Sequence, residues 1–253
     1  MNRIKVLRII ARLNIGGPAI HVVLLTKGLS ENNFESILVC GNIDEEEGDM
    51  SYYARQRDLH PIIIPQLKRN LGLINDFIAL KKIYQIIKNE NPDIIHTHTA
   101  KAGALGRLAG ILYNFSHPNK KIKIIHTFHG HALSGYFNKL VTWIFILIER
   151  ILALYTDKII TVSDSVRKEL IFLKICPYKK IQVVPLGLEL DKFFLIPPRE
   201  QGDGVINIGI VGRLVPIKNH KLFLESASLI IKRHPDKIMR FKIVGDGQLR
   251  KDL

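Results

Sequence analysis

Arginine and lysine stand close together after an apolar run in the segment 207–225, NIGIVGRLVPIKNHKLFLE. The run ends at Gly212, Arg213 follows it, and Lys218 precedes an apolar-periodic stretch that is typical of a helix. Backbone N–H groups at a helix start favour anions, and neighbouring Arg and Lys side chains suit a diphosphate. The segment therefore predicts a diphosphate site. Solvated loop charges are the alternative that these residues alone leave open.

A second group of polar residues follows successive predicted strands earlier in the chain. Gly16 and Gly17 follow the first strand, and five histidines follow two later ones: His96 and His98, then His126, His129 and His131. Because the carboxyl ends of parallel strands meet at one edge of a sheet, where ligands bind, we expect one site there. His129, beside Gly130 in a loop, is the residue that we expect to meet substrate. His96 and His126 are the candidates for core histidines.

Metal and dinucleotide sites are disfavoured by the spacing of the same residues. The two His-x-His pairs lack a paired acid, and no HExxH motif occurs. The first loop offers only Gly16-Gly17 instead of G-x-G-x-x-G, and Cys40-Gly41 stands where a ribose-binding acid is expected. We therefore expect neither a metal nor a cofactor.

Strands and helices alternate along the chain, which indicates an α/β fold with a doubly wound parallel sheet. Strands are predicted over 4–11, 34–39, 61–64, 93–97, 122–127, 157–162 and 181–184. Helices are predicted over 19–29, 51–58, 71–88, 100–113, 136–155 and 164–173. The helix over 136–155 has few polar positions, so we expect it to be largely buried.

A Pro-, Gly- and charge-rich stretch, 195–204, predicts a linker after a complete domain over 1–194. The alternation restarts at 205–253 with a strand over 205–211, a helix over 220–234 and a strand over 238–244. A domain usually has about 100–200 residues. We therefore expect 205–253 to be the opening of a second Rossmann-like domain whose remainder is missing.

Composition narrows the partners and the compartment. The 253 residues are 47% hydrophobic and carry a net charge of +14, which suits anionic partners. Lys and Arg are spread without a nucleic-acid-binding signature, so no nucleic acid is expected. Two isolated cysteines and the lack of a signal peptide fit the cytoplasm. The apolar run 143–148 is too short to span a bilayer, so we expect any membrane contact to be peripheral.

Taken in order, these motifs resemble the retaining glycosyltransferases of family 4, which have the GT-B fold. The matching stretches are LNIGGPAIHVVLL, HTHTAKAGALGRLAG (96–110), IHTFHGHALSGYF (125–137), DKIITVSDSVRKEL (157–170), VVPLGLELDKF (183–193), IGIVGRLVPIKNHKLFLESA (208–227) and FKIVGDGQLRKDL (241–253). HTHTAKAGALGR is similar to the subgroup that builds bacterial surface polysaccharides. In that family the N-terminal domain binds the acceptor and the C-terminal domain binds a nucleotide sugar.

The resemblance implies roles for individual residues. Arg213 and Lys218 would hold the donor diphosphate and stabilise the leaving group. Gly16 and Gly17 would approach the donor phosphate, and His129 would lie near the reacting sugar. The residues implied on the acceptor side are His96, His98, Lys101 and His131. The family needs no metal.

The implied reaction moves a hexose-type unit from a nucleotide diphosphate sugar to a glycan or polyprenyl-linked acceptor. The net charge favours the anionic inner face of a membrane. The family's Glu-x7-Glu donor element is not found in this chain, so truncation is expected and catalysis by the chain alone is left open. An inactive acceptor-binding module and a sugar-nucleotide epimerase are the alternatives, and the HTHTAKAGALGR and GRLVPIK segments favour transfer.

Overall fold

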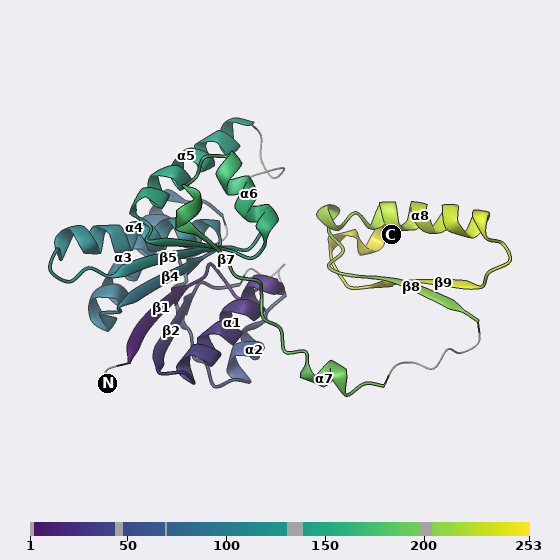
Figure 1. Cartoon of the computed structure of the whole chain (residues 1–253), viewed down its shortest axis with the longest axis horizontal. Coiled ribbons are helices and arrows are strands. Elements are labelled where there is room, and N and C mark those ends of the chain that lie inside the picture. Colours follow the sequence, from purple (N-terminus) through teal and green to yellow (C-terminus); the bar gives the residue numbers. More distant parts are fainter. Residues whose placement is uncertain (1–2, 44–47, 69, 131–138, 198–203) are drawn as a thin grey trace. The chain divides into compact units, whose positions relative to one another are not determined.

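A computed structural model describes residues 3–43, 48–68, 70–130, 139–197 and 204–253 (Figure 1). Contacts divide the chain into two compact units, Met1–Leu188 and Glu189–Leu253. Helix α7 (Asp191–Phe194) thus groups with the second unit, whereas the sequence places it before the linker. The domain bounds 1–194 and 205–253 stay predictions.

The first unit is built on a seven-stranded sheet in the order β3-β2-β1-β4-β5-β6-β7, with every pair parallel. The strands are β1 (Ile4–Ile9), β2 (Phe34–Cys40), β3 (Ile62–Ile63), β4 (Ile94–His98), β5 (Lys123–Phe128), β6 (Lys158–Thr161) and β7 (Ile181–Val183). From β1 the chain adds β2 and β3 on one side, and then returns to add β4 to β7 on the other side of β1. The strand order therefore reverses between β1 and β4. In such folds, ligands bind at this switch point, outside the carboxyl ends of the strands.

Helices cover both faces of this sheet (Figure 1). One face carries α1 (Gly17–Ser30) and α2 (Ser51–Arg55), and the other carries α3 (Leu73–Glu90), α4 (Ala100–Ser116), α5 (Lys139–Tyr155) and α6 (Asp164–Phe172). A separate apolar core lies between the sheet and the helices on each face. Ile10 packs with Val22 of α1 on one face, and Ile95 of β4 packs with Ile83 of α3 on the other. A short 3-10 turn, η1 (Tyr178–Lys180), precedes β7.

Small residues bring α4 close to the sheet. A methyl group at Gly106 would lie 2.7 Å from Cγ2 of Thr97 in β4. The helix is also tied to α5 by Arg107 and Glu149, which are both buried. Arg107 Nη2 donates to the two carboxylate oxygens of Glu149 at 2.7 and 2.8 Å. The pair fixes the rotation of α5 about its own axis.

The expectation that the helix over 136–155 is largely buried is wrong for one of its faces. Phe145, Leu152 and Ala153 of α5 pack inward, but Trp143 is 59% exposed on the opposite face. The cause is that α5 is apolar on both sides. Among the described parts of the chain, no helix has the length and continuous apolar character that a bilayer crossing requires.

The second unit contains a two-stranded parallel sheet of β8 (Ile206–Val211) and β9 (Met239–Val244). Between them lie a 3-10 turn, η2 (Pro216–Lys218), and α8 (His220–Arg233), and a last 3-10 turn, η3, spans Gln248–Lys251. The loops after the two strands pack on each other, because a methyl group at Gly245 would lie 1.9 Å from the Gly212 carbonyl oxygen. The predicted fold class, an α/β fold with a parallel sheet followed by a second strand–helix–strand unit, is confirmed.

Candidate active site

Three histidines meet at the carboxyl edge of the sheet in the first unit. His98 ends β4, His129 follows β5, and His21 lies in α1. Their nitrogen ligand atoms lie within 4.8 Å of one another. Nδ1 of His98 is 2.9 Å from Nε2 of His129, and the His21 ring meets the His129 ring edge-on at 5.2 Å between centroids. This set is called the histidine cluster below.

The other two described histidines of the predicted set have different surroundings. The His96 ring is tilted against the His98 ring, with 4.2 Å between the ring centroids, and His96 Nε2 lies 2.7 Å from Thr127 Oγ1. His126 points to the opposite face, where its Nδ1 lies 2.8 Å from Thr97 Oγ1. His126 is thus a satisfied core histidine, as expected for one of the candidates, and His96 supports His98 from within the sheet.

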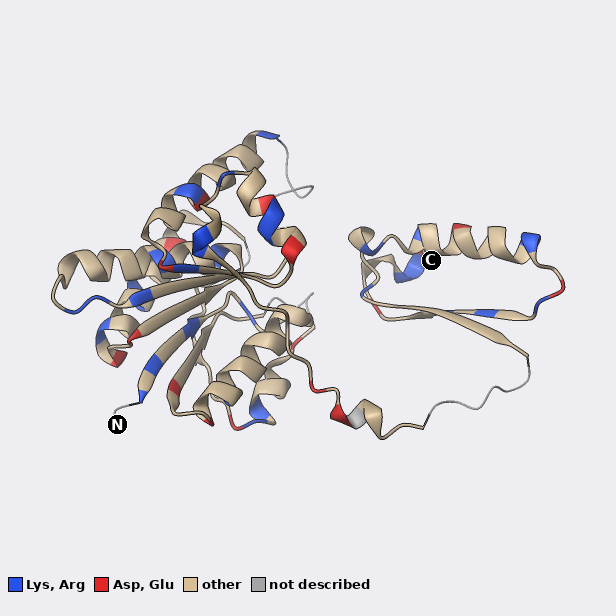
Figure 2. Cartoon of the chain, in the orientation of Figure 1, with Lys and Arg blue, Asp and Glu red and all other residues tan. Residues whose placement is uncertain are grey.

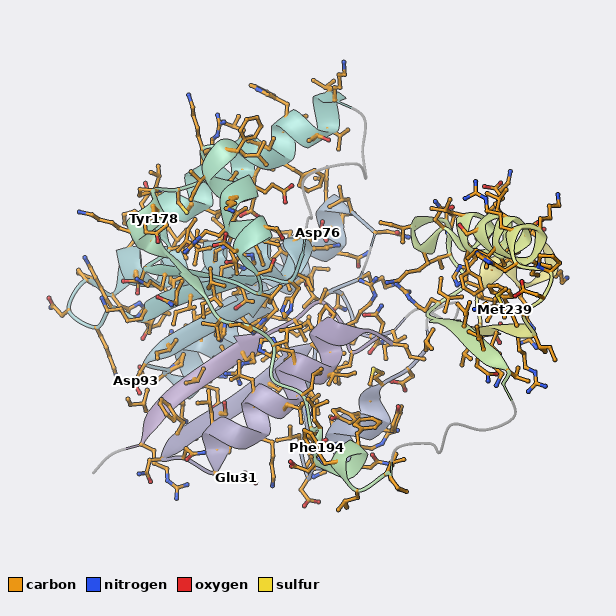
Figure 3. The ribbon with its side chains drawn as sticks, turned by 45° about the vertical axis from the view of Figure 1, so that its right-hand side comes forward. Glu31, Asp76, Asp93, Tyr178, Phe194 and Met239 are labelled. Carbon is orange, nitrogen blue, oxygen red and sulfur yellow. The ribbon has the colours of Figure 1, made fainter. Side chains whose placement is uncertain are left out.

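Lys101 is engaged elsewhere, although the sequence places it on the acceptor side. Its ammonium group forms an ion pair with Asp76 and donates to the Asn70 carbonyl at 2.5 Å, so it ties the start of α4 to the start of α3. Figure 3 shows Asp76 at this edge of the sheet and Asp93 at the opposite edge, where the strands begin. His131, the remaining acceptor-side prediction, lies outside the described residues.

A buried positive charge lies near the histidine cluster. Arg8 in β1 is fully buried, stands in register with His96, and has Nη1 bonded to the hydroxyls of Thr26 at 2.9 Å and Ser36 at 3.1 Å. Within the described part of the chain, its Nε and Nη2 have no hydrogen-bond partner. Burial lowers the pKa of Arg8 to about 9, so the group is still charged at neutral pH.

Burial and this charge keep the histidines neutral. Burial, followed by the charge of Arg8, lowers the pKa of His96 well below its usual value. Burial and then His96, His129 and Arg8 do the same to the pKa of His98. Burial and then His21 lower the pKa of His129 to about 4, while burial and then Arg8 lower the pKa of His21.

The His98–His129 bond determines what the pair can offer to a ligand. In neutral rings one nitrogen carries a proton and the other is an acceptor. Whichever ring donates in the shared bond, the two outer nitrogens, His98 Nε2 and His129 Nδ1, are then one donor and one acceptor. Both atoms are buried, and both lack a partner among the residues that the structure describes. This combination fits a sugar hydroxyl, which donates and accepts at once.

The same three rings have the composition of a metal site, since imidazole is a common ligand of Zn²⁺ and related ions. The nearby charge of Arg8 opposes a cation there, and the cluster itself contains no carboxylate to offset it. The expectation of a metal-free site stays a prediction.

The backbone beside the cluster is open. Helix α1 begins at Gly17, where an added methyl group would meet no atom within 4 Å, and at Gly16 it would meet only Pro18 Cδ at 3.7 Å. Internal packing therefore does not explain the glycine pair. Thr99, between His98 and α4, has φ of 64°, which is strained for a β-branched residue and is typical of functional sites.

His21 is the functional candidate that sequence reasoning missed. It lies four residues after Gly17, one helical turn into a helix that starts at the ligand edge of the sheet. That spacing within GGPAIH was the available signal, because it returns the side chain to the edge where the helix begins.

The second unit presents the predicted cations in an open setting. Arg213 and Lys218 are exposed, and neither has a carboxylate partner in the described ranges. The Lys218 stem passes Gly212, with Cδ 3.8 Å from where a methyl group at that glycine would lie. Helix α8 begins just beyond, with Asn219 as the N-cap that accepts from Leu222 N at 3.4 Å. Lys218 thus lies at the end of η2, two residues before the helix begins.

Comparison with known proteins finds glycosyltransferases among the relatives of this chain. The chain is 32% identical over 237 residues to the UDP-Gal:alpha-D-GlcNAc-diphosphoundecaprenol alpha-1,3-galactosyltransferase of Escherichia coli, covering 89% of this chain and 57% of that protein. A glycosyltransferase structure from Rickettsia africae aligns with a TM-score of 0.64 at 19% identity, over 99% of this chain and 62% of that one.

The fold is shared with epimerases as well. The UDP-GlcNAc 2-epimerase of Neisseria meningitidis, bound to UDP-GlcNAc, aligns with a TM-score of 0.64 at 15% identity, over 95% of this chain and 65% of that one. At identities of 19% and 15%, both structural likenesses show the fold alone. The model of Glycosyltransferase Family 4, by contrast, matches residues 15–192, which include the glycine pair and the whole histidine cluster, and the chain belongs to that family.

Proposed function

We propose that this chain takes part in a retaining hexosyl transfer from a nucleotide diphosphate sugar to a glycan or polyprenyl-linked acceptor, in the synthesis of bacterial surface polysaccharide. The observation that carries the proposal is the neutral His98–His129 pair, which offers one donor and one acceptor beside the open glycine start of α1. Neutral hydrogen-bonding rings at a strand edge suit a sugar better than a charged group.

Arg213 and Lys218 are proposed to hold the donor diphosphate. Charge develops on the departing phosphate during transfer, and two exposed cations without carboxylate partners within the described residues can meet it. With these cations on the leaving group and Arg8 opposing a cation at the cluster, the proposed reaction uses no metal and no cofactor. His129 is proposed to contact the reacting sugar, and His96, His98 and His131 are proposed on the acceptor side. Lys101 is proposed on the acceptor side as well, at the start of α4, where Asp76 holds its ammonium group.

The proposed place of action is the cytoplasmic face of an anionic membrane, where a polyprenyl-linked acceptor presents its polar end. The net charge of +14 supports this place, and so does the lipid-linked acceptor in the name of the Escherichia coli relative. The chain spans 57% of that relative's length, so the activity of a whole enzyme is itself part of the proposal.

The test is the release of nucleoside diphosphate and the transfer of sugar, with a panel of nucleotide sugars and a polyprenyl-diphosphate sugar as the acceptor. Arg213→Ala should lower transfer by roughly a hundredfold or more, as the loss of one charge-stabilising group does elsewhere. Lys221→Ala, the matched control, changes an exposed lysine on α8 of the same unit and should leave transfer unchanged. Epimerised nucleotide sugar without transfer would identify the epimerase instead, and acceptor binding without turnover would identify a binding module.

A further inference from the structure

Helix α5 has an apolar face that none of the described residues of the first unit covers. Its inner side packs on the sheet, and Glu149 on that side is bound to Arg107. The outer side repeats at helical spacing and is between 41% and 74% exposed at Leu140, Trp143, Ile144, Leu147, Ile151 and Leu154. Monomeric soluble proteins rarely expose contiguous apolar patches of this kind, which mark interaction sites.

The patch extends onto the neighbouring helices. Tyr155 at the end of α5 meets Phe115 of α4 edge-on, with 5.9 Å between ring centroids, and both rings are exposed. On the other side, Arg150 donates to the Leu173 carbonyl at 2.8 Å, next to Phe172 of α6, which is 83% exposed. Aromatic rings thus flank the aliphatic stripe on both sides.

The surroundings of this face are basic. Residues 139–180 contain eight Lys and Arg against four Asp and Glu. Of the four acids, Glu149 is buried in its ion pair and Asp164 is paired with Arg167. Figure 2 shows Lys and Arg along α5 and α6. An apolar stripe within a net basic surface complements anionic lipid headgroups, each basic residue near such a surface adding to the attraction.

We propose that the outer face of α5 docks on an anionic phospholipid bilayer and lies in the plane of its interface. Trp143 would sit at headgroup level, because its ring is apolar and its N–H needs a wet partner. The inference rests on the proposed function in one respect: a polyprenyl-linked acceptor is met at such a surface. It names the helix face that makes the contact.

The sole tryptophan of the chain makes the test direct, because all tryptophan emission comes from Trp143. The full chain is titrated with vesicles of phosphatidylglycerol and phosphatidylcholine, and separately with phosphatidylcholine alone. The expected result is a shift of emission to shorter wavelength with the anionic vesicles, quenching by brominated acyl chains, and cosedimentation that weakens with salt. Neutral vesicles should bind much more weakly.

Two variants separate this face from exposed apolar residues in general. Ile151→Glu should weaken binding by about tenfold or more, since burying one aliphatic side chain is worth roughly that factor. Leu73→Glu, at a 92% exposed position on α3, is the matched control and should bind like the original chain. Equal loss in both variants would overturn the proposal.

Two further outcomes would also overturn it. One is an unshifted emission with anionic vesicles. The other is a dimer in solution that already shields Trp143, because the face would then join two copies of the chain. Vesicle binding requires neither donor nor acceptor. A lack of vesicle binding would therefore not contradict the proposed transfer reaction. A lack of transfer activity would not prevent the vesicle experiment from testing the α5 face.

Discussion

His98 and His129 come from the ends of two neighbouring strands, and their Nδ1 and Nε2 atoms are 2.9 Å apart. Because each ring fixes the tautomer of the other, we expect His98→Ala and His129→Ala to act as one unit. The change in the activation free energy of transfer in the double variant should differ by about 0.5–3 kcal/mol from the sum of the changes in the two single variants. His60→Ala, at an exposed histidine before β3, serves as the control. Strictly additive losses would contradict a shared bond.

The neutral histidines predict a specific dependence of stability on pH. His129 has a folded pKa of about 4, below the unfolded value of about 6.5. Between these values the unfolded chain binds a proton that the folded chain does not. Stability is therefore fully present above about pH 6.5 and is lost as pH falls toward about 4, with a limiting slope of about 1.4 kcal/mol per pH unit for each such group. Urea unfolding followed by Trp143 emission at several pH values measures it.

His129→Asn should reduce the slope of the free energy of unfolding against pH by the contribution of one titrating group. Carboxylates continue to contribute at lower pH. A variant with an unchanged slope between pH 6.5 and pH 4 would mean that His129 is protonated in the folded state, in conflict with its burial beside His21.

The glycine pair allows activity and stability to be separated. Gly17→Ala places a methyl group where no atom lies within 4 Å, so we expect the free energy of unfolding to change by less than about 0.5 kcal/mol. Transfer should fall by about tenfold or more if donor phosphate approaches this backbone, because small misplacements of substrate are costly. Gly41→Ala is the converse control, since its methyl group would lie 2.0 Å from the Leu67 carbonyl oxygen and should destabilise the fold. Full transfer by Gly17→Ala would remove the glycine pair from the donor site.

The buried ion pair between α4 and α5 predicts a large loss of stability when one partner is removed. Glu149→Ala leaves the Arg107 charge buried and unpaired, which typically costs about 3–5 kcal/mol. Glu149→Gln keeps one acceptor and should cost less. Joint replacement by Arg107→Met and Glu149→Leu should recover most of the loss. Urea unfolding measures all three, and a near-neutral Glu149→Ala would show that the pair does not hold α5.

Much of the fold could be predicted from the sequence because strands and helices differ in period. The alternation places β4 and β5 with their histidines at one sheet edge, and parallel strands bring such ends together without further information. The Arg213 and Lys218 loop is visible for the same reason, since an apolar run ends beside it.

The rest depends on helix rotation and on contacts between residues that are distant in sequence. His21 reaches the cluster only because α1 is turned so that this residue faces β4, and the sequence period alone did not single it out. Lys101 is adjacent in sequence to the histidine motif, yet Asp76 on another helix holds it. Composition predicts the outer face of α5 as core, because it cannot distinguish apolar residues that pack inward from apolar residues on an exposed face.

The ion pair of Arg107 and Glu149 has a consequence for how this family can change over time. A single replacement at either position leaves the charge of the other residue buried and unpaired. Replacement of both residues by apolar side chains keeps the two helices packed. Related sequences should accordingly retain both residues or lack both, and mixed pairs should be scarce. The two positions, 42 residues apart in the chain, should therefore co-vary among related sequences.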